Sequence, residues 1–378
     1  MNILMVLFDN INVGGGGPEV ILQVASRLSM SGDRITVITT SYGIRSNVNA
    51  NDYLKKNLID IYEISVLNPT SIPSPKSKRI IKTKFLESDI VYFFVRMGGL
   101  EHYLLKLQNS LKKPVIAGHH GVIDQANIRI SVFQRLYYKI YGGRDGRTVK
   151  RFAGQHVLNK KDFEALFNRK FQEIFLIPNG IELDRYYVNK KKGDKFIILY
   201  LARLEPEKGV KDIPEMLDLL LKNGVFNFKL IVCGDGSLKD YVSNMSKKYT
   251  SISFQGYVFG EKKLDFLSKS HILVSLSHGE AFGLSILEGI ASGTPVVAID
   301  NPGVHELIRE GENGYLVNSV NEMVEKILDL YKTFANDFDS YLALSRRCRE
   351  SSQNYNWDSV VARYRDMFSE VIRKFNEK

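Results

Sequence analysis

Two glutamates eight residues apart, Glu280 and Glu288, lie in the most informative segment of the sequence, His278–Gly293 (HGEAFGLSILEGIASG). The segment follows a short apolar run, Ile272–Leu276, so the pattern predicts a strand, a loop and then a helix. Loops at the carboxyl ends of parallel strands face the ligand crevice of such a fold. Carboxylates placed there can accept hydrogen bonds from hydroxyl groups, and sugar or ribose hydroxyls are the natural donors.

The helix in this segment is expected to begin at about Gly283. The backbone N–H groups of Phe282, Gly283 and Leu284 would lack helical partners there and would form an anion site suited to a diphosphate. Gly283 would let a phosphate approach the backbone closely. The structural alternative is that Glu280 caps the helix and Glu288 is solvated. The pair of glutamates in a strand–loop–helix context favours ligand binding.

A second segment, Tyr200–Gly209 (YLARLEPEKG), ends another predicted strand and carries two cations, Arg203 and Lys208. Both are expected at the top of the same sheet, where they would neutralise a pyrophosphate leaving group without a metal ion. The alternative is an ordinary surface Arg and Lys, and the position after a strand favours the functional interpretation.

Strands and helices must alternate to position these segments. Before Pro178, strands are expected at Asn2–Phe8, Arg34–Thr40, Asp89–Val95 and Pro114–Gly118, and helices at Pro18–Met30 and Leu100–Leu111. This is the rhythm of a parallel, doubly wound sheet. The stretch Asn68–Lys84 is rich in Pro, Ser and Lys and is expected to be a flexible loop.

The same rhythm restarts after Pro178. Five apolar runs predict strands at Phe196–Leu201, Phe228–Cys233, Ile252–Gln255, Ile272–Leu276 and Pro295–Ile299. The join lies near Ile174–Asp184, where Pro and Asn-Gly mark a turn. The 378-residue chain is therefore predicted to hold two doubly wound α/β domains, residues 1–176 and 177–356, followed by an amphipathic helix, Trp357–Phe375.

Bulk properties narrow the class of protein. No apolar run approaches the ~18 residues of a membrane-spanning helix, and Met1–Phe8 is interpreted as a first strand and not as a secretion signal, so a cytoplasmic protein is expected. Cys233 and Cys348 form no metal-ligand pattern. Two buried thiols are the simpler interpretation, with a disulfide left open.

Positive charge is concentrated in the first half of the chain. Residues up to Pro178 hold 25 Lys and Arg against 14 Asp and Glu, whereas the remainder holds 27 against 28. The asymmetry indicates an anionic partner for that half, either a membrane surface or a polyanion. A role in solubility alone stays open.

Together these segments make the chain resemble glycosyltransferase family 4, a retaining family with the two-domain GT-B fold. The resemblance covers nearly the whole chain, and its most specific parts are the Glu280–Glu288 segment, the Arg203/Lys208 pair and the join Ile177–Tyr186 (IPNGIELDRY). It implies transfer of a hexose-type sugar from a UDP- or GDP-sugar to a hydroxyl of a glycan or lipid-linked acceptor. It also implies that no metal and no other cofactor is needed.

The resemblance implies a role for each matching residue. Glu280 would bind hydroxyls of the donor sugar and Glu288 the ribose, while Arg203 and Lys208 would stabilise the departing diphosphate. The loop that begins at Gly234 and the segment that holds Tyr257 and Val258 match regions that shape the nucleobase pocket.

In the first domain the resemblance adds two further matches. The glycine run Gly14–Gly17 matches a loop whose backbone faces the phosphate or the acceptor, through Gly15, Gly16 and Gly17. His120 matches a histidine that contacts the donor sugar near the reacting centre, and His119 would then point into the sheet. The family's last helix returns to the first domain, which assigns residues 357–378 to that domain.

The acceptor side is expected in the basic first domain. The segment Ile128–Lys150 interleaves cations with aromatic residues at helical spacing, and Lys76–Lys84 is a second basic cluster. A basic amphipathic helix suits the anionic inner face of the cell membrane, whereas the alternative is an ordinary core-facing helix with solvated charges.

Three other classes of protein are compatible with parts of this pattern. A sugar-nucleotide epimerase with the same fold would need further acid/base carboxylates, and a non-catalytic sugar-nucleotide-binding protein would not need Glu280 or Arg203 for transfer. A nucleic-acid role has no recognisable module to support it. The Asp337–Asp339 triplet lies in a predicted helix–helix junction and is assigned no metal role.

Overall fold

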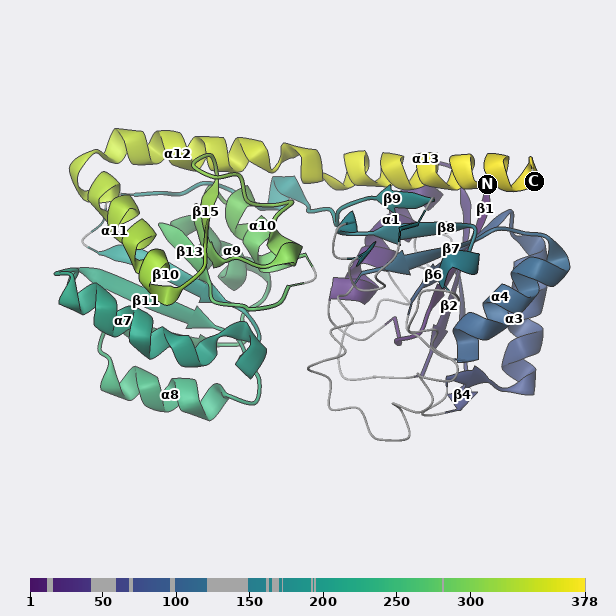
Figure 1. Cartoon of the computed structure of the whole chain (residues 1–378), viewed down its shortest axis with the longest axis horizontal. Helices are drawn as coiled ribbons and strands as arrows, with labels where there is room; N and C mark the ends of the chain where they lie inside the picture. The colour runs from purple at the N-terminus through teal and green to yellow at the C-terminus, as the bar shows by residue number, and fades with distance from the viewer. Residues whose placement is uncertain are drawn as a thin grey trace. The chain divides into compact units, whose positions relative to one another are not determined.

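The computed structural model describes residues 1–11, 16–41, 59–67, 71–95, 99–120, 149–160, 163–164, 170–171, 173–191, 193, 195–280 and 282–377. The chain divides into two compact units (Figure 1). Unit 1 comprises Met1–Gly180 with Trp357–Lys378, and unit 2 comprises Ile181–Asn356. The boundary thus falls between Gly180 and Ile181 instead of between residues 176 and 177, and the last helix belongs to unit 1.

Unit 1 is built on a parallel sheet that has seven strands within the described residues, in the order β3-β2-β1-β6-β7-β8-β9. The strands are β1 (Asn2–Leu7), β2 (Arg34–Thr40), β3 (Asp60–Ile64), β6 (Ile90–Phe94), β7 (Val115–His119), β8 (Gly154–Val157) and β9 (Ile174–Leu176). Since all of them run the same way, their carboxyl ends share one edge of the sheet. His119 ends β7 and His120 follows it, so both lie at that edge.

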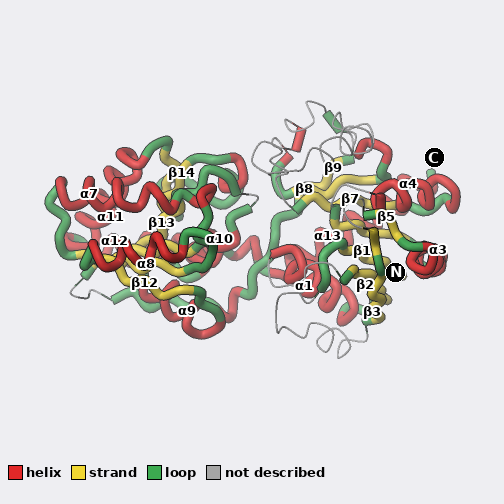
Figure 2. The backbone as a smooth tube through the Cα atoms, turned by 90° about the horizontal axis from the view of Figure 1, so that it is seen from below, coloured by secondary structure: helices red, strands yellow, loops and turns green. Residues whose placement is uncertain are grey.

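Helices cover both faces of this sheet. On one face, α1 (Gly16–Met30) and α13 (Trp357–Asn376) share a core with Ile3 and Met5 of β1. On the other face, α3 (Pro75–Glu87) and α4 (Gly99–Leu111) pack with Leu4 and Val6. The alternation of β1 side chains between the two faces explains its nearly continuous apolar sequence. The two helix layers can be followed in Figures 1 and 2.

Helix α3 corrects an expectation, because residues 75–84 are helical and do not form a flexible loop. Ser74 caps the helix by accepting a hydrogen bond from the Ser77 N–H at 3.2 Å, and Pro75 occupies the first turn. Ile81 and Phe85 are fully buried. Just before the helix, β4 (Val66–Leu67) and β5 (Ile72–Pro73) pair as a short antiparallel ribbon.

Unit 2 repeats the architecture with six described parallel strands in the order β12-β11-β10-β13-β14-β15. They are β10 (Phe196–Leu201), β11 (Phe228–Cys233), β12 (Ile252–Gly256), β13 (Ile272–Ser275), β14 (Val296–Ile299) and β15 (Gly314–Val317). The strand order reverses between β10 and β13, which are direct neighbours. In doubly wound sheets, ligands bind where the order reverses, outside the carboxyl ends of the strands.

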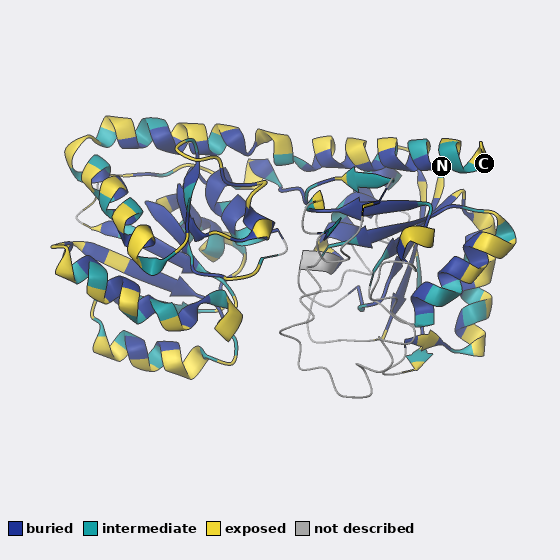
Figure 3. Ribbon diagram, in the orientation of Figure 1, coloured by how far each residue is buried: buried dark blue, intermediate teal, exposed yellow. Residues whose placement is uncertain are grey.

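The helices of unit 2 lie on both faces of its sheet. One core is shared by the sheet with α7 (Ile213–Lys222), α8 (Lys239–Lys248), α11 (Val320–Asn336) and α12 (Phe338–Ser351). The remaining helices are α9 (Gly260–Lys269) and α10 (Leu284–Ala291). The central strands are largely buried, whereas the helices alternate buried with exposed residues along their length (Figure 3).

Three further features of the structure concern the sequence predictions. Asp337 ends α11 and caps α12 by accepting from the Ser340 N–H at 3.0 Å, so the expected helix–helix junction is confirmed. Both cysteines are free and buried. No helix among the described residues is long and apolar enough to cross a bilayer.

Candidate functional site

The two segments singled out in the second half of the sequence meet at the strand-order reversal of unit 2. Arg203 and Lys208 follow β10, and His278–Gly283 follow β13. The Lys208 ammonium donates to Glu280 Oε1 at 2.7 Å, to the Gly279 carbonyl at 3.2 Å and to Ser277 Oγ at 3.4 Å. The side chains of Lys208 and Glu280 are only 11% and 17% exposed, respectively. The structure therefore brings the predicted cation and the first predicted glutamate into one ion pair.

Gly209 is what allows this approach. Its φ is +68°, and a Cβ atom there would lie 2.1 Å from the Leu276 carbonyl oxygen, at the end of β13. The turn after β10 can therefore lie directly against the end of β13 only with glycine at this position. The backbone thus places Lys208 beside the Glu280 loop.

Asn301 fixes the Glu280 loop from the next strand. Its side-chain oxygen accepts from the Glu280 N–H at 3.2 Å, and its amide nitrogen donates to the Ser277 carbonyl at 3.1 Å. Asn301 is buried and follows β14. The loop that carries Glu280 is thus held from both neighbouring strands.

Helix α10 begins where the sequence predicted. Gly283 has a left-handed φ of +77° and no side chain caps the helix start. Phe282 is buried, with its ring edge-on to Tyr355 at 6.2 Å, and Leu284 is half-buried. Residue 281 lies outside the described residues. The first-turn N–H groups of the helix therefore have no capping side chain among the described residues, as an anion site requires.

Glu288 lies inside α10 and is held by two residues that sequence reasoning missed. Lys263 Nζ of α9 donates to Glu288 Oε1 at 2.5 Å, and the Tyr186 hydroxyl donates to the same oxygen at 3.1 Å. Tyr186 closes the IPNGIELDRY segment, so that motif held a signal for this contact. Lys263 lies in a lysine-rich stretch with no such signal.

Arg203 is less constrained. Its side chain is 68% exposed and donates to Glu207 Oε1 at 3.1 Å. It follows β10, as predicted, but it does not join the Lys208–Glu280 pair.

The predicted nucleobase region lies at the carboxyl ends of β11 and β12. The Gly234 N–H donates to the Gly256 carbonyl at 2.8 Å, and a Cβ on Gly234 would lie 1.9 Å from the Ala202 carbonyl oxygen. Val258 is buried, whereas Tyr257 and Phe259 are 70% and 72% exposed and stack at 6.0 Å. The edge therefore presents an exposed aromatic pair.

The predicted residues of unit 1 are placed in part. Gly16 and Gly17 are the first residues of α1, whereas Gly15 lies outside the described residues. Most of the basic segment Ile128–Lys150 also lies outside them, since residues 121–148 are not described. His119 Nε2 is 2.9 Å from Gln155 Oε1 on β8. It thus contacts the neighbouring strand.

His120 belongs to a buried hydrogen-bonded group in unit 1. Its Nε2 lies 2.6 Å from the Tyr92 hydroxyl, which is also 2.6 Å from His156 Nδ1. Its Nδ1 lies 3.3 Å from Asn179 Oδ1, and its ring stacks on Phe94 at 4.3 Å. Both ring nitrogens of His120 therefore face polar atoms of unit 1, and a contact of His120 with a sugar stays a prediction.

The hydrogen bonds define which nitrogens carry protons. His156 Nε2 lies 2.8 Å from the Ile177 carbonyl, which can only accept, so that nitrogen bears the hydrogen. Nδ1 of a neutral His156 then accepts from Tyr92, and His120 Nε2 donates to the Tyr92 oxygen. Nδ1 of this His120 tautomer can only accept, so a hydrogen bond with Asn179 requires the Asn179 amide to turn its NH₂ group toward the ring. Burial lowers the pKa of His156 to about 4 and that of His120 well below its usual value, so both rings are neutral at pH 7.

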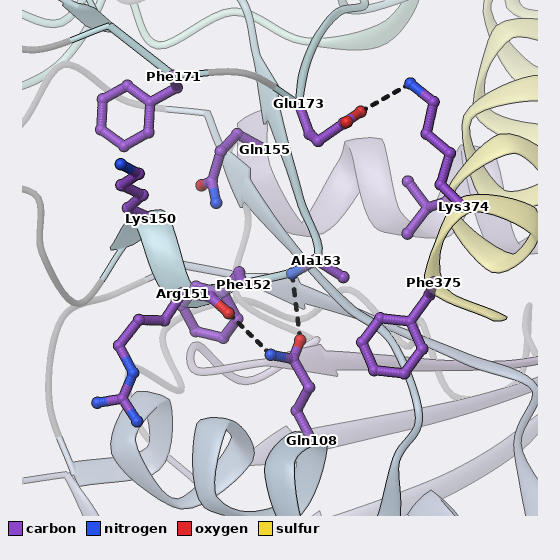
Figure 4. A pocket seen from close by; sticks show the side chains of 11 residues that line it. Gln108, Lys150, Arg151, Phe152, Ala153, Gln155, Phe171, Glu173, Lys374 and Phe375 are labelled. Atoms are coloured by element: carbon purple, nitrogen blue, oxygen red, sulfur yellow. Dashed lines mark hydrogen bonds and ion pairs between the residues drawn. The ribbon is translucent and has the colours of Figure 1, made fainter. Parts of the chain in front are cut away.

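A separate cavity of about 220 Å³ lies at the opposite, amino-terminal edge of the sheet of unit 1 (Figure 4). Its buried amide, Gln108, donates to the Arg151 carbonyl at 2.8 Å and accepts from the Ala153 N–H at 3.1 Å, while Lys374 pairs with Glu173 at 2.9 Å. None of the predicted site residues lines it. It is therefore not part of the predicted site.

Within the described ranges, no three histidine, cysteine, aspartate or glutamate side chains gather as metal ligands would. Metal independence is not tested by this and stays a prediction.

Comparison with known sequences points to one family. A family model described as glycosyl transferases group 1 matches residues 187–349. An uncharacterized glycosyltransferase of Methanocaldococcus jannaschii is 30% identical over 271 residues, which are 70% of this chain and 71% of the relative. For two further curated relatives, the chain spans only 55% and 49% of the relative's length.

Comparison with solved structures supports the same fold. A glycosyltransferase from Rickettsia africae matches with a TM-score of 0.76 at 19% identity, over 98% of each chain. HepE of Anabaena, solved in complex with UDP and glucose, matches with a TM-score of 0.72 at 16% identity, over 98% of this chain and 100% of that one. The expected fold of two doubly wound domains, GT-B, is confirmed.

Proposed function

Because the chain belongs to the group 1 glycosyltransferases, we propose that it is a retaining, metal-independent hexosyltransferase of family 4. It takes the sugar from a UDP- or GDP-sugar and passes it to a hydroxyl of a glycan or lipid-linked acceptor. The observation that carries this proposal is the ion pair of Lys208 with Glu280, 2.7 Å long, at the strand-order reversal of unit 2. HepE of Anabaena, which has the same fold, is described in complex with UDP and glucose.

The residues divide the chemistry among them. The diphosphate lies against the first-turn N–H groups of α10 near Gly283. The partial positive charge of this helix start and the full charges of Lys208 and Arg203 stabilise the leaving group. Glu280 accepts from hydroxyls of the sugar, and Glu288 accepts from those of the ribose. Each carboxylate is already oriented by a lysine, so little reordering is needed when the donor binds.

The transfer step needs no reactant besides the sugar donor and the acceptor hydroxyl. The bond between the anomeric carbon and the diphosphate oxygen breaks, and its electron pair leaves with the diphosphate. The acceptor hydroxyl oxygen then bonds to the anomeric carbon from the same face, and its proton passes to the leaving phosphate oxygen. No separate base is required.

A thermal-shift screen of UDP, GDP and their sugar conjugates tests the proposal, because a ligand that binds the native state raises Tm. We expect one nucleotide series to stabilise the protein, and Glu280→Ala and Arg203→Ala to lose most of the donor hydrolysis and transfer. Glu325→Ala, which changes an exposed glutamate of α11, is the matched control and should retain activity. Formation of an epimerised nucleotide sugar, or full activity of Glu280→Ala, would contradict the proposal.

For the acceptor side, we propose that unit 1 binds an anionic membrane surface through α3. Lys76, Arg79 and Lys82 are exposed at three-residue spacing along this helix, and no acidic side chain among the described residues pairs with them. Leu86 on the same helix is 49% exposed. Cations beside an exposed apolar side chain match an anionic lipid surface, which attracts each Lys or Arg by about 1 kcal/mol.

Vesicle cosedimentation tests this surface. Vesicles with anionic lipid should bind the protein, and the triple change Lys76→Gln, Arg79→Gln, Lys82→Gln should weaken binding by roughly a hundredfold. A control triple of exposed unit 2 lysines, Lys222→Gln, Lys229→Gln, Lys247→Gln, removes the same charge. Equal binding of the two triples, or equal binding to neutral vesicles, would overturn the assignment to α3.

A further inference from the structure

The hydrogen bonds that the described residues make to the Glu288 carboxylate all reach one of its two oxygens. Lys263 Nζ at 2.5 Å and the Tyr186 hydroxyl at 3.1 Å both donate to Oε1, and no hydrogen bond from the described residues reaches Oε2. Glu288 is 17% exposed and Lys263 is 27% exposed. One carboxylate oxygen is therefore occupied by the protein, and the other has its acceptor sites open to a ligand.

The three side chains come from separate parts of unit 2. Glu288 lies in α10, Lys263 in the first turns of α9, and Tyr186 in the segment after the unit boundary. Arg349 ties that segment to α10, since it donates to the Leu183 carbonyl at 2.9 Å and to the Ala291 carbonyl at 2.6 Å. Arg349 thus holds the backbone three residues before Tyr186 against the end of α10.

Between Lys263 and Tyr186, Lys263 has the larger effect on the orientation of the Glu288 carboxylate. A carboxylate in a helix interior can rotate about its side-chain torsions, and an ammonium on one oxygen removes that freedom while keeping the group ionised. Lys263 brings a full positive charge to the carboxylate, whereas Tyr186 donates from an uncharged hydroxyl, so the bond from Lys263 is the stronger of the two. The open oxygen is then presented in one orientation, as a pair of adjacent hydroxyls would need.

We propose that Lys263, assisted by Tyr186, is a positioning residue that orients Glu288 for the ribose hydroxyls and so makes the site selective for ribonucleotides over deoxyribonucleotides. This rests on the proposed donor site in unit 2. Lys263 itself does not touch the nucleotide, so its effect should appear only when the ligand has ribose hydroxyls for Glu288 to bind.

Calorimetric titration with UDP and GDP, each beside its 2′,3′-dideoxy form, tests the proposal on the full chain. Since hydrogen bonds to a charged group are the stronger ones, we expect the tighter wild-type ligand to lose about tenfold or more in affinity without its hydroxyls. Lys263→Met should reduce that preference to about threefold or less, with little change for the dideoxy form. Lys263→Arg should restore most of the preference, and Tyr186→Phe should lower it by a smaller factor.

The matched control is Lys262→Met, because Lys262 is the exposed neighbour on the same helix and lies over the Phe266 ring. It should keep the full preference, and thermal unfolding should show that all variants are folded. A Lys263→Met protein that lost both ligands equally, or that kept the wild-type preference while Glu288→Ala lost it, would overturn the positioning role. Equal wild-type affinity for the ribose and dideoxy ligands would instead remove the ribose contact from the proposed function.

Discussion

At the residue scale, each glutamate of the pair is held by its own lysine. Lys208 bonds Glu280 at 2.7 Å and Lys263 bonds Glu288 at 2.5 Å. The sequence predicted that the two glutamates lie in the loop and the helix that follow β13, because the strand–loop–helix order follows from local pattern. It could not predict these pairings, since they join residues that are distant in sequence and that only the tertiary fold brings together.

The turn at Gly209 gives a prediction at this scale. Gly209→Ala should lower the free energy of unfolding of unit 2, because alanine strains the left-handed backbone and its Cβ would meet the Leu276 carbonyl oxygen at 2.1 Å. Gly224→Ala is the matched control, since Gly224 has a φ of +80° with no atom within 4 Å. Urea unfolding should show a loss at Gly209 larger by about 2 kcal/mol. Equal losses would show that the close approach does not matter.

At the element scale, sequence pattern predicted most strands of both sheets, including the edge strand β12, but missed β3, β8, β9 and β15. β1, β6, β10 and β13 are runs of apolar residues, and such runs carry their own signal. β8 (GQHV) and β15 (GYLV) contain glycine and polar residues, and they become strands because neighbouring strands pair with them. Helix α3 was missed for a related reason, because its Pro and Ser form the helix start and not a loop.

The dependence of unit 1 on α13 gives a prediction for an element. Phe368 is fully buried against Tyr92 and Tyr364, so Phe368→Ala should destabilise unit 1 by about 3–5 kcal/mol. The neighbouring Ser369→Ala, at an exposed position of the same helix, should be nearly neutral. Fluorescence of Trp357, the single tryptophan of the chain, reports on this core during denaturation. A loss below about 1 kcal/mol for Phe368→Ala would argue against α13 as part of the core.

At the scale of the whole molecule, the two units should respond differently to acid. His119 and His156 of unit 1 have pKa values lowered by burial to about 4, and His120 is lowered as well, whereas unit 2 has His271 at about 4 among its described histidines. These folded-state values lie below the unfolded value of roughly 6.5. The unfolded chain therefore binds more protons between those pH values, and stability falls as pH falls.

The expected loss between about pH 6.5 and pH 4 is roughly 3 kcal/mol for the fully buried His156 alone, and unit 1 should lose stability more steeply than unit 2. Hydrogen exchange in β6 and β7, compared with β10 and β11 over this range, measures both units at once. Parallel profiles for the two units would contradict the prediction.

Unit 1 is made from two stretches of chain that are separated by the whole of unit 2. During translation, residues 1–180 leave the ribosome long before Trp357, Tyr364 and Phe368, which complete one side of their core. Unit 2 is continuous in sequence and can finish first. The part of the polypeptide that is synthesised first is therefore the last to complete its core. Until α13 emerges, the part of the unit 1 sheet that α13 covers stays accessible to chaperones.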